Sequence, residues 1–293
     1  MSEAQQFSDG LAVAVEKAAK SVVTVDARGR QPASGIVWSA DGEILTAEHV
    51  VQRDENIKVT LPDGKALTAT VLGRDPASDL ALLKVPAVSL TVPDFVDGIK
   101  VGHLIFAVGR PEDLQATLGS VIGLGGPMPG RRHQLDAYIW TDVTMYPGFS
   151  GGPLIDASGR VAGLNSSALA RGASLAIPVA VLKNVSAALK QDGRVKRGFL
   201  GISTQPVALA EGVAEKLGQS TGLMVISTEK DGPAEKGGLM QGDVLVGLGT
   251  HAVADIDDLQ AALGPDTVNK PAQAKIVRGG EVKELSITIG VRE

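Results

Sequence analysis

The pattern that most constrains the fold is a succession of short apolar runs separated by turn signals, which continues to about residue 177. The runs are rich in Val, Ile and Leu, a composition typical of strands. The turns between them contain Gly, Pro or Asp, as at Asp41-Gly42, Pro62-Asp63-Gly64 and Ser158-Gly159. Strands separated by turns about every 8–12 residues predict an all-β sandwich or barrel.

Two helical patterns flank this β-rich region. Asp9–Lys20 repeats apolar residues at helical spacing, and Ser8 or Asp9 can cap the predicted helix. After the last apolar run, Pro178 stands at an early helical position, and apolar residues at helical spacing follow over Val179–Leu189. Gly193 is in the position to end this second helix.

The length of 293 residues predicts two domains. The basic and polar stretch Gln191–Arg197 has the composition of a linker. Beyond it, residues 198–293 mix apolar strand patterns with two helix candidates, Ala208–Leu217 and Ile256–Leu263. The sequence therefore predicts a β domain over residues 1–190 and a smaller α+β domain over 198–293.

Composition narrows the possible functions. The formal net charge is −5, and its deficit lies in residues 198–293, which hold 8 basic and 13 acidic residues. Without a basic excess, and with only five Phe, two Trp and two Tyr, the chain is not expected to bind nucleic acid. The absence of Cys excludes thiolate chemistry. The longest charge-free run, Leu114–Gly130, contains five Gly and two Pro, so no membrane span is expected.

Three residues have the kinds of side chain that acyl transfer requires. His49 ends an apolar strand pattern, Asp79 precedes another, and Ser150 lies in the glycine-rich segment GFSGG. A serine hydroxyl is a weak nucleophile until an imidazole removes its proton. A buried carboxylate fixes the tautomer of the imidazole and stabilises the imidazolium. We therefore expect His49, Asp79 and Ser150 to form a catalytic triad.

The glycines around the serine allow its loop to turn sharply, so that backbone N–H groups converge where an oxyanion forms. The N–H groups of Gly148 and Ser150 are the expected donors. GFSGG also fits the nucleophile elbow of α/β-hydrolases, which requires a strand–turn–helix context and a later histidine. His251 is the histidine downstream, but a strand pattern follows the serine, which favours a β-barrel protease. His103, His133 and His251 lie in turn-like surroundings without metal-ligand spacing, so neither a metal site nor a cofactor is expected.

Around these residues the chain resembles the HtrA/Deg family of trypsin-like serine proteases. ASGIVWSADGEILTAEHVV, DPASDLALLKV and TDVTMYPGFSGGPLIDASGRVAGLN are similar to the family's histidine, aspartate and serine blocks. RGFLGI and the segment from GLMVIS to DDLQAAL are similar to a PDZ domain of that family. These blocks follow one another in the order and spacing of the family, and the resemblance covers nearly the whole chain.

The resemblance implies a mainly β fold. A chymotrypsin-like double six-stranded β-barrel over residues 1–190 would precede a linker at 191–197 and an α+β PDZ domain at 198–293. It also implies a serine endopeptidase for unfolded or misfolded proteins, a homo-oligomer built on trimers, and an extracytoplasmic location. Met1–Gly10 lacks the basic start and apolar run of a signal peptide, so a cytoplasmic location stays open.

The specificity pocket is expected around Thr144 and Met145, with a far wall from Asn165, Ser166 and Ser167. In trypsin-like enzymes that cut after Arg or Lys, an Asp occupies the position of Thr144. Without that carboxylate, a small or medium apolar side chain is the expected guest.

In the PDZ domain, four residues resemble the carboxylate-binding loop and its strand: Phe199, Leu200, Gly201 and Ile202. Leu259 and Leu263 would form the other wall of a groove that takes peptide C-termini. The alternative is that these apolar residues simply fill the domain core.

Two features depart from the family pattern. Phe149 precedes the serine where the family usually has Asn, and RGRQPAS is too short for a long regulatory loop. Phe149 leaves open a catalytically silent, peptide-binding scaffold. An esterase acting on small acyl substrates is a further alternative.

Overall fold

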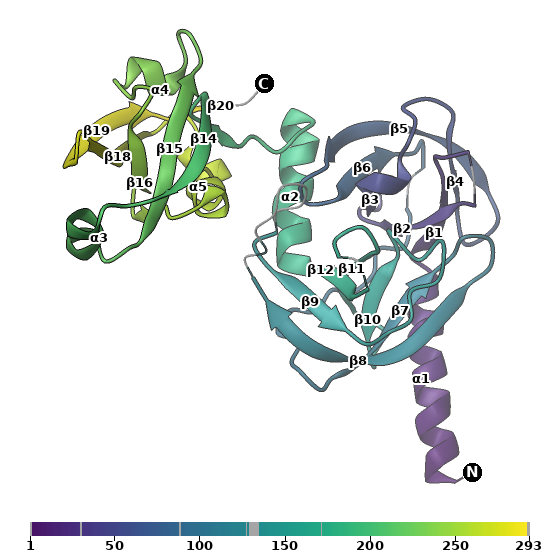
Figure 1. The fold of residues 1–293 in the computed structure, drawn as a ribbon. Coiled ribbons are helices and arrows are strands. Elements are labelled where there is room, and N and C mark those ends of the chain that lie inside the picture. Colours follow the sequence, from purple (N-terminus) through teal and green to yellow (C-terminus); the bar gives the residue numbers. More distant parts are fainter. Residues whose placement is uncertain are drawn as a thin grey trace. The chain divides into compact units, whose positions relative to one another are not determined.

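The computed structural model describes residues 2–29, 31–87, 89–126, 128, 135–170 and 172–291. The chain divides into two compact units, with the boundary between Val195 and Lys196. Figure 1 shows the helices and strands of both units.

The first unit begins with helix α1 (Glu3–Ala19), which is followed by a six-stranded closed barrel. Its strands follow one another around the barrel in the order β1-β2-β3-β6-β5-β4, and every pair is antiparallel. The 3₁₀ helix η1 (Glu48–Val50) follows β3 directly. The strands are β1 (Val22–Asp26), β2 (Ala33–Val37), β3 (Glu43–Ala47), β4 (Ile57–Thr60), β5 (Ala66–Asp75) and β6 (Leu80–Lys84).

A second closed barrel follows, in the order β10-β11-β12-β9-β8-β7 (Figure 1). Helix α2 (Val179–Asp192) continues from its last strand and packs against strands of both barrels, namely β5, β6, β11 and β12. The strands are β7 (Leu104–Gly109), β8 (Gln115–Gly125), β9 (Tyr138–Thr141), β10 (Pro153–Asp156), β11 (Val161–Ser166) and β12 (Ser174–Pro178).

Several strands of this unit are buried along their whole length. Every residue of β2, β3, β10 and β11 is buried. One face of such a strand lines its own barrel, and the other is covered by the second barrel or a helix. This explains why the apolar runs are continuous rather than alternating. Strand β3 of the first barrel contacts β11 of the second, and β2 contacts β7, so these strands line the contact between the barrels.

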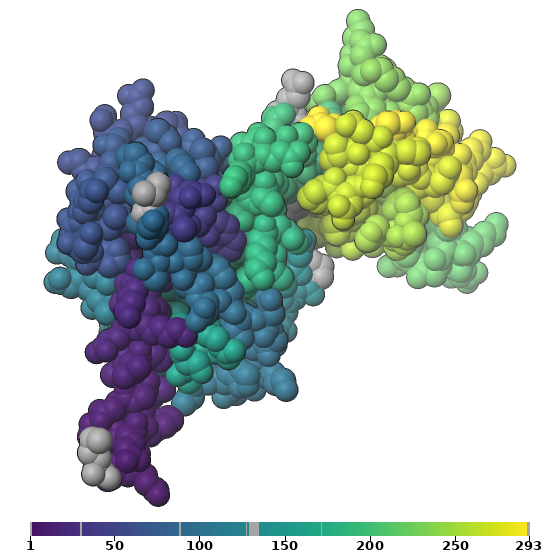
Figure 2. Space-filling view, turned by 180° about the vertical axis from the view of Figure 1, so that it is seen from behind, coloured from purple at the N-terminus to yellow at the C-terminus, as the bar shows by residue number. Residues whose placement is uncertain are grey.

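The sequence predicted the end of α2 correctly but not the start of α1. Helix α1 spans Glu3–Ala19 rather than 9–20, because Ser2 caps it by accepting from the Gln5 N–H. Its first turns expose every side chain, so they lack the apolar periodicity that marked the second half. Figure 2 shows α1 extending outward from the first unit. Helix α2 ends at Gly193 in the left-handed conformation (φ +71°), as expected, and its last residues fall inside the predicted linker 191–197.

The second unit contains a six-stranded sheet whose main path is β14-β15-β16-β18-β19, with β17 paired to β16. A short pair, β13 (Gly198–Phe199) with β20 (Gly290–Val291), lies beside it. Three helices accompany the sheet: α3 (Glu211–Leu217), α4 (Pro233–Lys236) and α5 (Ile256–Ala262), with the 3₁₀ helix η2 (Pro265–Thr267). The strands are β14 (Ile202–Ala208), β15 (Thr221–Thr228), β16 (Val244–Leu248), β17 (His251–Ala252), β18 (Pro271–Arg278) and β19 (Glu281–Thr288).

The helix predicted over Ala208–Leu217 starts too early. Ala208 ends strand β14, where it pairs with Thr221 of β15, and the helix begins at Glu211. The predicted fold class is confirmed: two six-stranded barrels followed by an α+β domain. Among the described residues, every helix is too short or too polar to cross a membrane.

An ion pair inside the second unit gives its stability a defined pH dependence. Asp243 is 2% exposed, and Arg278 donates to both of its carboxylate oxygens at 2.7 Å. Burial opposes ionisation of this carboxyl, but the bonds from Arg278 and from the Met240 N–H outweigh it and lower the pKa of Asp243. Folding therefore favours the carboxylate.

We expect Arg278→Met to destabilise the second unit by about 3–5 kcal/mol at neutral pH, because a buried carboxylate loses its partner. The pKa of Asp243 is depressed in the folded state, so wild-type stabilisation is present above about pH 4 and lost as the pH falls further. The difference in free energy of unfolding between the variant and the wild type should shrink over the same pH range. Hydrogen exchange of amides in β16 and β18 measures this free energy in both proteins. A difference that does not change with pH contradicts the role assigned to the ion pair.

Candidate active site

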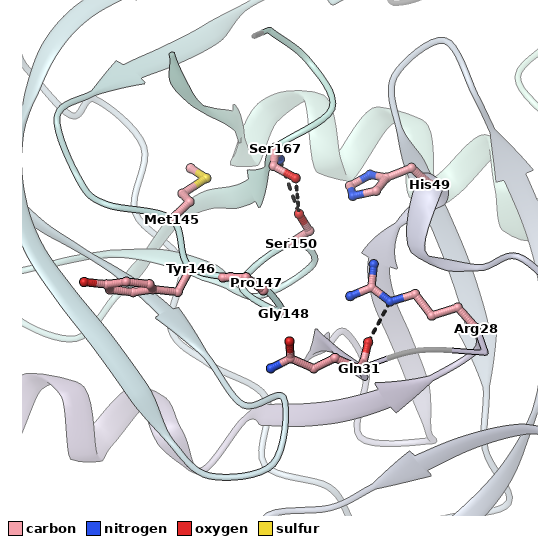
Figure 3. Close-up of a pocket in the computed structure, with 9 residues that line it drawn as sticks. All are labelled: Arg28, Gln31, His49, Met145, Tyr146, Pro147, Gly148, Ser150 and Ser167. Carbon is pink, nitrogen blue, oxygen red and sulfur yellow. Dashed lines mark hydrogen bonds between the residues drawn. The ribbon is translucent and has the colours of Figure 1, made fainter. Parts of the chain in front are cut away.

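His49 lies at the centre of η1, which turns the chain immediately after β3. Its backbone N–H donates to Asp79 Oδ1 at 2.9 Å. Its Nδ1 lies 3.0 Å from Asp79 Oδ1 and 2.9 Å from Oδ2. One carboxylate therefore holds both the backbone and the ring of His49. With Nδ1 occupied, Nε2 is the nitrogen left for chemistry, and the ring borders a cavity (Figure 3).

Asp79 is held in an unusual backbone conformation directly before β6. Its φ is +55°, a left-handed value that Asp adopts more readily than most residues. Its carbonyl accepts from the Glu48 N–H, and its side chain is completely buried. Besides His49, the carboxylate accepts a short hydrogen bond from the hydroxyl of Ser166 at the end of β11. A carboxylate of the first barrel is thus anchored by a strand of the second.

Glu48 adds a second carboxyl near the histidine. Burial and the neighbouring charge of Asp79 raise the pKa of Glu48, while Arg74, whose Nη1 lies 3.8 Å from Glu48 Oε1, acts in the opposite direction. The charge of Asp79 therefore contributes to the raised pKa of Glu48, the residue before His49.

Ser150 sits in the turn that precedes β10. Its Oγ lies 3.0 Å from the hydroxyl of Ser167 and accepts from the Ser167 N–H at 3.3 Å. Within the part of the chain that the structure describes, no hydrogen bond joins Ser150 to His49. Both side chains nevertheless border the same cavity (Figure 3). Bonds between catalytic groups are often long before substrate binds, so this geometry is compatible with a base and a nucleophile.

Ser34 of β2 fixes the loop in front of Ser150. Its hydroxyl donates to the carbonyl of Gly148 at 2.7 Å, and its N–H donates to the carbonyl of Ser150 at 3.1 Å. The same hydroxyl accepts from the Arg110 N–H at 2.7 Å. Gly148 has φ +94°, and a Cβ there would approach Pro111 to 2.5 Å, so only glycine fits.

The carbonyls that Ser34 binds belong to the peptide groups whose N–H groups are those of Phe149 and Gly151, and these donate to the carbonyls of Tyr146 and Asn165. Among the described residues, the N–H groups of Gly148 and Ser150 have no acceptor, and both residues line the cavity. Two convergent donors of this kind are suited to an oxyanion. Sequence reasoning named the two donors but missed Ser34 and Arg110, although Ser34 lies within the block quoted around His49.

Phe149 is a structural part of this loop. Its side chain is completely buried and meets the ring of Tyr146 edge-on at 5.9 Å. The ring lies against Gly109 at the end of β7, where an added Cβ would come within 2.8 Å of Phe149 Cδ1. The aromatic residue therefore occupies space that a glycine leaves open.

The cavity beside Ser150 has a volume of about 330 Å³. Of the residues expected to form the specificity pocket, Met145 and Ser167 line it. The lining residues, shown in Figure 3, are Arg28, Gln31, His49, Met145, Tyr146, Pro147, Gly148, Ser150 and Ser167.

The structure places the other three expected pocket residues elsewhere. Ser166 supports Asp79, and Asn165 is fully buried with its amide donating to the carbonyl of Pro153 at 2.8 Å. Thr144 is exposed and its carbonyl accepts from the Thr117 hydroxyl. Every residue of β11 is buried, so its neighbouring residues do not alternate between cavity and core, and the roles of Thr144, Asn165 and Ser166 in specificity stay a prediction.

In the second unit, the predicted groove residues divide into two groups. Leu200 and Leu259 are 1% and 4% exposed and belong to the core, so they do not line an open groove. Phe199, Ile202 and Leu263 are half-buried. Gly201 has φ +73°, and its carbonyl accepts from the Glu229 N–H. Strand β14 pairs with β15 alone among the described strands, so its other edge is open.

His103 and His251 are exposed, as expected, whereas His133 lies outside the described residues. The part of the chain that the structure describes contains no group of three His, Asp or Glu side chains that fits a metal ion.

The fold and the site together define a trypsin-like serine protease domain followed by a PDZ domain. Residues 33–164 match the trypsin-like peptidase domain family, and residues 198–289 match the PDZ domain family. Among solved structures, the HtrA-type protease AlgW with a decapeptide has a TM-score of 0.78 at 28% identity, covering 97% of this chain and 99% of that one. A variant of AlgW with a tripeptide has a TM-score of 0.79 at 30% identity, with 97% of both chains covered.

The chain belongs to the HtrA family of trypsin-like serine proteases. A protein named probable periplasmic serine endoprotease DegP-like, from Ectopseudomonas mendocina (strain ymp), is 40% identical over 268 residues, 88% of this chain and 56% of that protein. The chain spans about half the length of the curated relatives that it matches.

The bonds of Ser34 lead to a prediction about turnover. In Ser34→Ala the Gly148 carbonyl loses its donor and the Arg110 N–H loses its acceptor, so the loop is free to rotate the Gly148 N–H away from the cavity. We expect kcat to fall about tenfold or more while KM changes little, since an oxyanion is bound only in the transition state.

Ser186→Ala is the matched control, because it removes another buried serine hydroxyl, one that donates within α2 to the Lys183 carbonyl. Steady-state kinetics on a peptide substrate compares the two variants. Equal kcat values in both variants, with similar losses in melting temperature, contradict the assigned role of Ser34.

Proposed function

We propose that this chain is a serine endopeptidase that hydrolyses peptide bonds of unfolded or misfolded proteins. The observation that carries the proposal is the buried carboxylate of Asp79 holding His49, beside a cavity that Ser150 and two unpaired backbone N–H groups share. These are the groups that acyl transfer needs: a nucleophile, a general base with a fixed tautomer, and oxyanion donors.

In the proposed reaction, Ser150 turns from Ser167 toward His49 when substrate displaces solvent from the cavity. Nε2 of His49 takes the hydroxyl proton as Oγ attacks the scissile carbonyl, and Asp79 stabilises the resulting imidazolium. The N–H groups of Gly148 and Ser150 bind the oxyanion. His49 then returns the proton to the leaving amine, and a water molecule hydrolyses the acyl-enzyme by the same route.

The cavity supports an apolar residue before the cleaved bond. Its lining residues include Met145 and no carboxylate, so a Lys or Arg side chain would be desolvated without a partner. The alternative of a catalytically silent scaffold is less well supported. The ring of Phe149 packs in the space left by Gly109, and Gly148 and Ser150, the residues of the proposed oxyanion donors, still line the cavity. Degradation of casein, as opposed to turnover of small esters alone, distinguishes an endopeptidase from an esterase.

Ser150→Ala is expected to abolish hydrolysis of unfolded casein, because the nucleophile is removed while a small side chain remains. Asp79→Asn is expected to lower kcat by about 10⁴, since the imidazole is then held in the wrong tautomer. Gel assays and mass spectrometry of the fragments measure both effects, and the wild-type fragments also show whether cuts follow apolar residues. Wild-type rates in Ser150→Ala, with the fold intact by circular dichroism, exclude the proposed triad.

For the second unit we propose binding of peptides with a free apolar C-terminus along the open edge of β14. Backbone pairing supplies the affinity, and N–H groups of the 199–201 loop hold the terminal carboxylate. The half-buried Phe199, Ile202 and Leu263 are the residues left to contact the peptide, with Leu200 and Leu259 supporting them from the core.

Gly201→Trp is expected to weaken peptide binding at least about tenfold from a Kd on the order of micromolar, because the ring fills the space where the peptide backbone must approach. Gly280→Trp is the control: it also replaces a glycine of positive φ (+83°), in the β18–β19 turn with open space around it. Fluorescence anisotropy of a labelled hexapeptide, with a free or amidated terminus, measures binding. Equal affinity in both variants rules out this groove.

We also propose a cellular location for the chain from the names of its relatives. Relatives named periplasmic support an extracytoplasmic location. The homo-oligomer, a trimer by family resemblance, stays a prediction from the sequence.

A further inference from the structure

The segment that carries His49 is bound by two residues of one hairpin in the first barrel. Strands β5 and β6 form this hairpin and pair in antiparallel register, with Arg74 opposite Ala81 (Figure 1). Arg74 lies near the end of β5, and Asp79 lies in the turn directly before β6. Both residues therefore come from one short stretch of chain, on the two sides of the same turn.

Arg74 takes no direct part in the proposed reaction, but its guanidinium binds the residues that follow η1. Its side chain is 24% exposed. Nη1 donates to the Val51 carbonyl at 2.6 Å, and Nη2 donates to the Arg53 carbonyl at 3.0 Å and to Asp54 Oδ1 at 2.6 Å. The donors of a guanidinium lie in one plane with fixed directions. Arg74 therefore fixes where the chain runs as it leaves η1.

Asp79 binds the other end of the same turn. Its carbonyl accepts from the Glu48 N–H at 3.0 Å, and its Oδ1 accepts from the His49 N–H at 2.9 Å. Within η1 the Val51 N–H donates to the Glu48 carbonyl, but a helix of three residues has too few bonds of its own to hold its shape. The orientation of His49 therefore depends on the bonds that the hairpin makes at both ends of η1.

The backbone of Arg74 is itself anchored to a third element. Its N–H donates at 3.1 Å to the carbonyl of Gly193, the residue that ends α2. Gly73 permits this close approach, since an added Cβ would come within 2.6 Å of the same carbonyl. Helix α2 also packs against both β5 and β6. The guanidinium therefore extends from a fixed point, which a group that orients another side chain requires.

We propose that Arg74 is a positioning residue for His49. By binding the carbonyls of Val51 and Arg53, it holds η1 where the imidazole meets both Asp79 and the cavity. The inference rests on the proposed peptidase function, in which Nε2 of His49 takes the proton of the nucleophile. Without the guanidinium both carbonyls lose these donors, so η1 can move and the imidazole spends part of its time away from the productive position.

Arg74→Met tests the effect on turnover, because it removes the guanidinium and keeps an unbranched apolar side chain. We expect kcat on a peptide substrate to fall about tenfold or more while KM stays within about twofold of wild type, since a misplaced base slows the chemical step without weakening substrate binding. Arg74→Lys keeps the charge but not the planar set of donors, so it should recover only part of kcat. If Arg74→Met does not fold, the kcat of Arg74→Lys decides the test.

Arg160→Met is the matched control. It removes another guanidinium of the same unit, one whose Nε donates to Asp156 Oδ2 at 2.9 Å in the second barrel and which does not line the cavity. This variant should keep the wild-type kcat.

Nitrogen NMR of isotope-labelled histidine tests the position of the imidazole separately from turnover. The spectrum reports which ring nitrogen of His49 carries the proton once the imidazole is neutral. Wild type and Arg160→Met should show one tautomer, with the proton on Nδ1 facing Asp79. Arg74→Met, at a temperature where it is folded, should show a mixture of both tautomers.

The two measurements separate this proposal from the proposed reaction. If wild type cleaves no peptide, yet the tautomer of His49 becomes mixed in Arg74→Met alone, the proposed reaction fails and the positioning role stands. A single tautomer in Arg74→Met, with or without a loss of kcat, overturns the positioning role. So does a mixture already present in wild type, a wild-type kcat in Arg74→Met, or an equal loss of kcat in Arg160→Met.

Discussion

The buried carboxylate of Asp79 is the constraint on which the rest of the site depends. Left without donors this carboxylate would cost several kcal/mol of stability, so the chain must bring several donors to it. His49 supplies two from the turn after β3, and Ser166 supplies one from β11 of the other barrel. The left-handed backbone of Asp79 persists because these bonds over-determine it. The relative position of the two barrels and the orientation of the imidazole are consequently set by the same group.

Ser34 holds the loop of the second barrel that carries Ser150, as Asp79 holds His49. It is fully buried, and it binds the carbonyls of Gly148 and Ser150 from the first barrel. The same peptide groups are held at their other ends, because the N–H groups of Phe149 and Gly151 donate to the carbonyls of Tyr146 and Asn165. The loop that carries the N–H groups of Gly148 and Ser150 is therefore fixed by hydrogen bonds to both barrels. Arg110 extends this arrangement, since its N–H donates to Ser34 and its guanidinium donates to the Ala19 carbonyl near the end of α1.

The sequence predicts the strands, the barrels and the three reactive residues because their signals are local: apolar runs, turn residues and short blocks around His49 and Ser150. The roles of Ser34 and Ser166 escape such reasoning, because their partners lie 114 and 87 residues away along the chain. Orientation within a strand is also hidden where both faces are buried, which is why Asn165 was expected in the pocket. Exposed helical turns carry no periodicity, which is why α1 begins earlier than expected.

The charged groups Asp79 and Arg28 differ in how deeply they are buried. The carboxylate of Asp79 lies behind the imidazole of His49 without contact with solvent, where it would stabilise the imidazolium of the proposed reaction. Arg28, by contrast, lies on the cavity wall and is half-buried. Phe149 occupies the apolar space under the loop, and no charged group of the lining residues competes with these two. In the proposed reaction, the carboxylate of Asp79 therefore stabilises the proton that passes from the Ser150 hydroxyl to His49, which is the direction that nucleophilic attack requires.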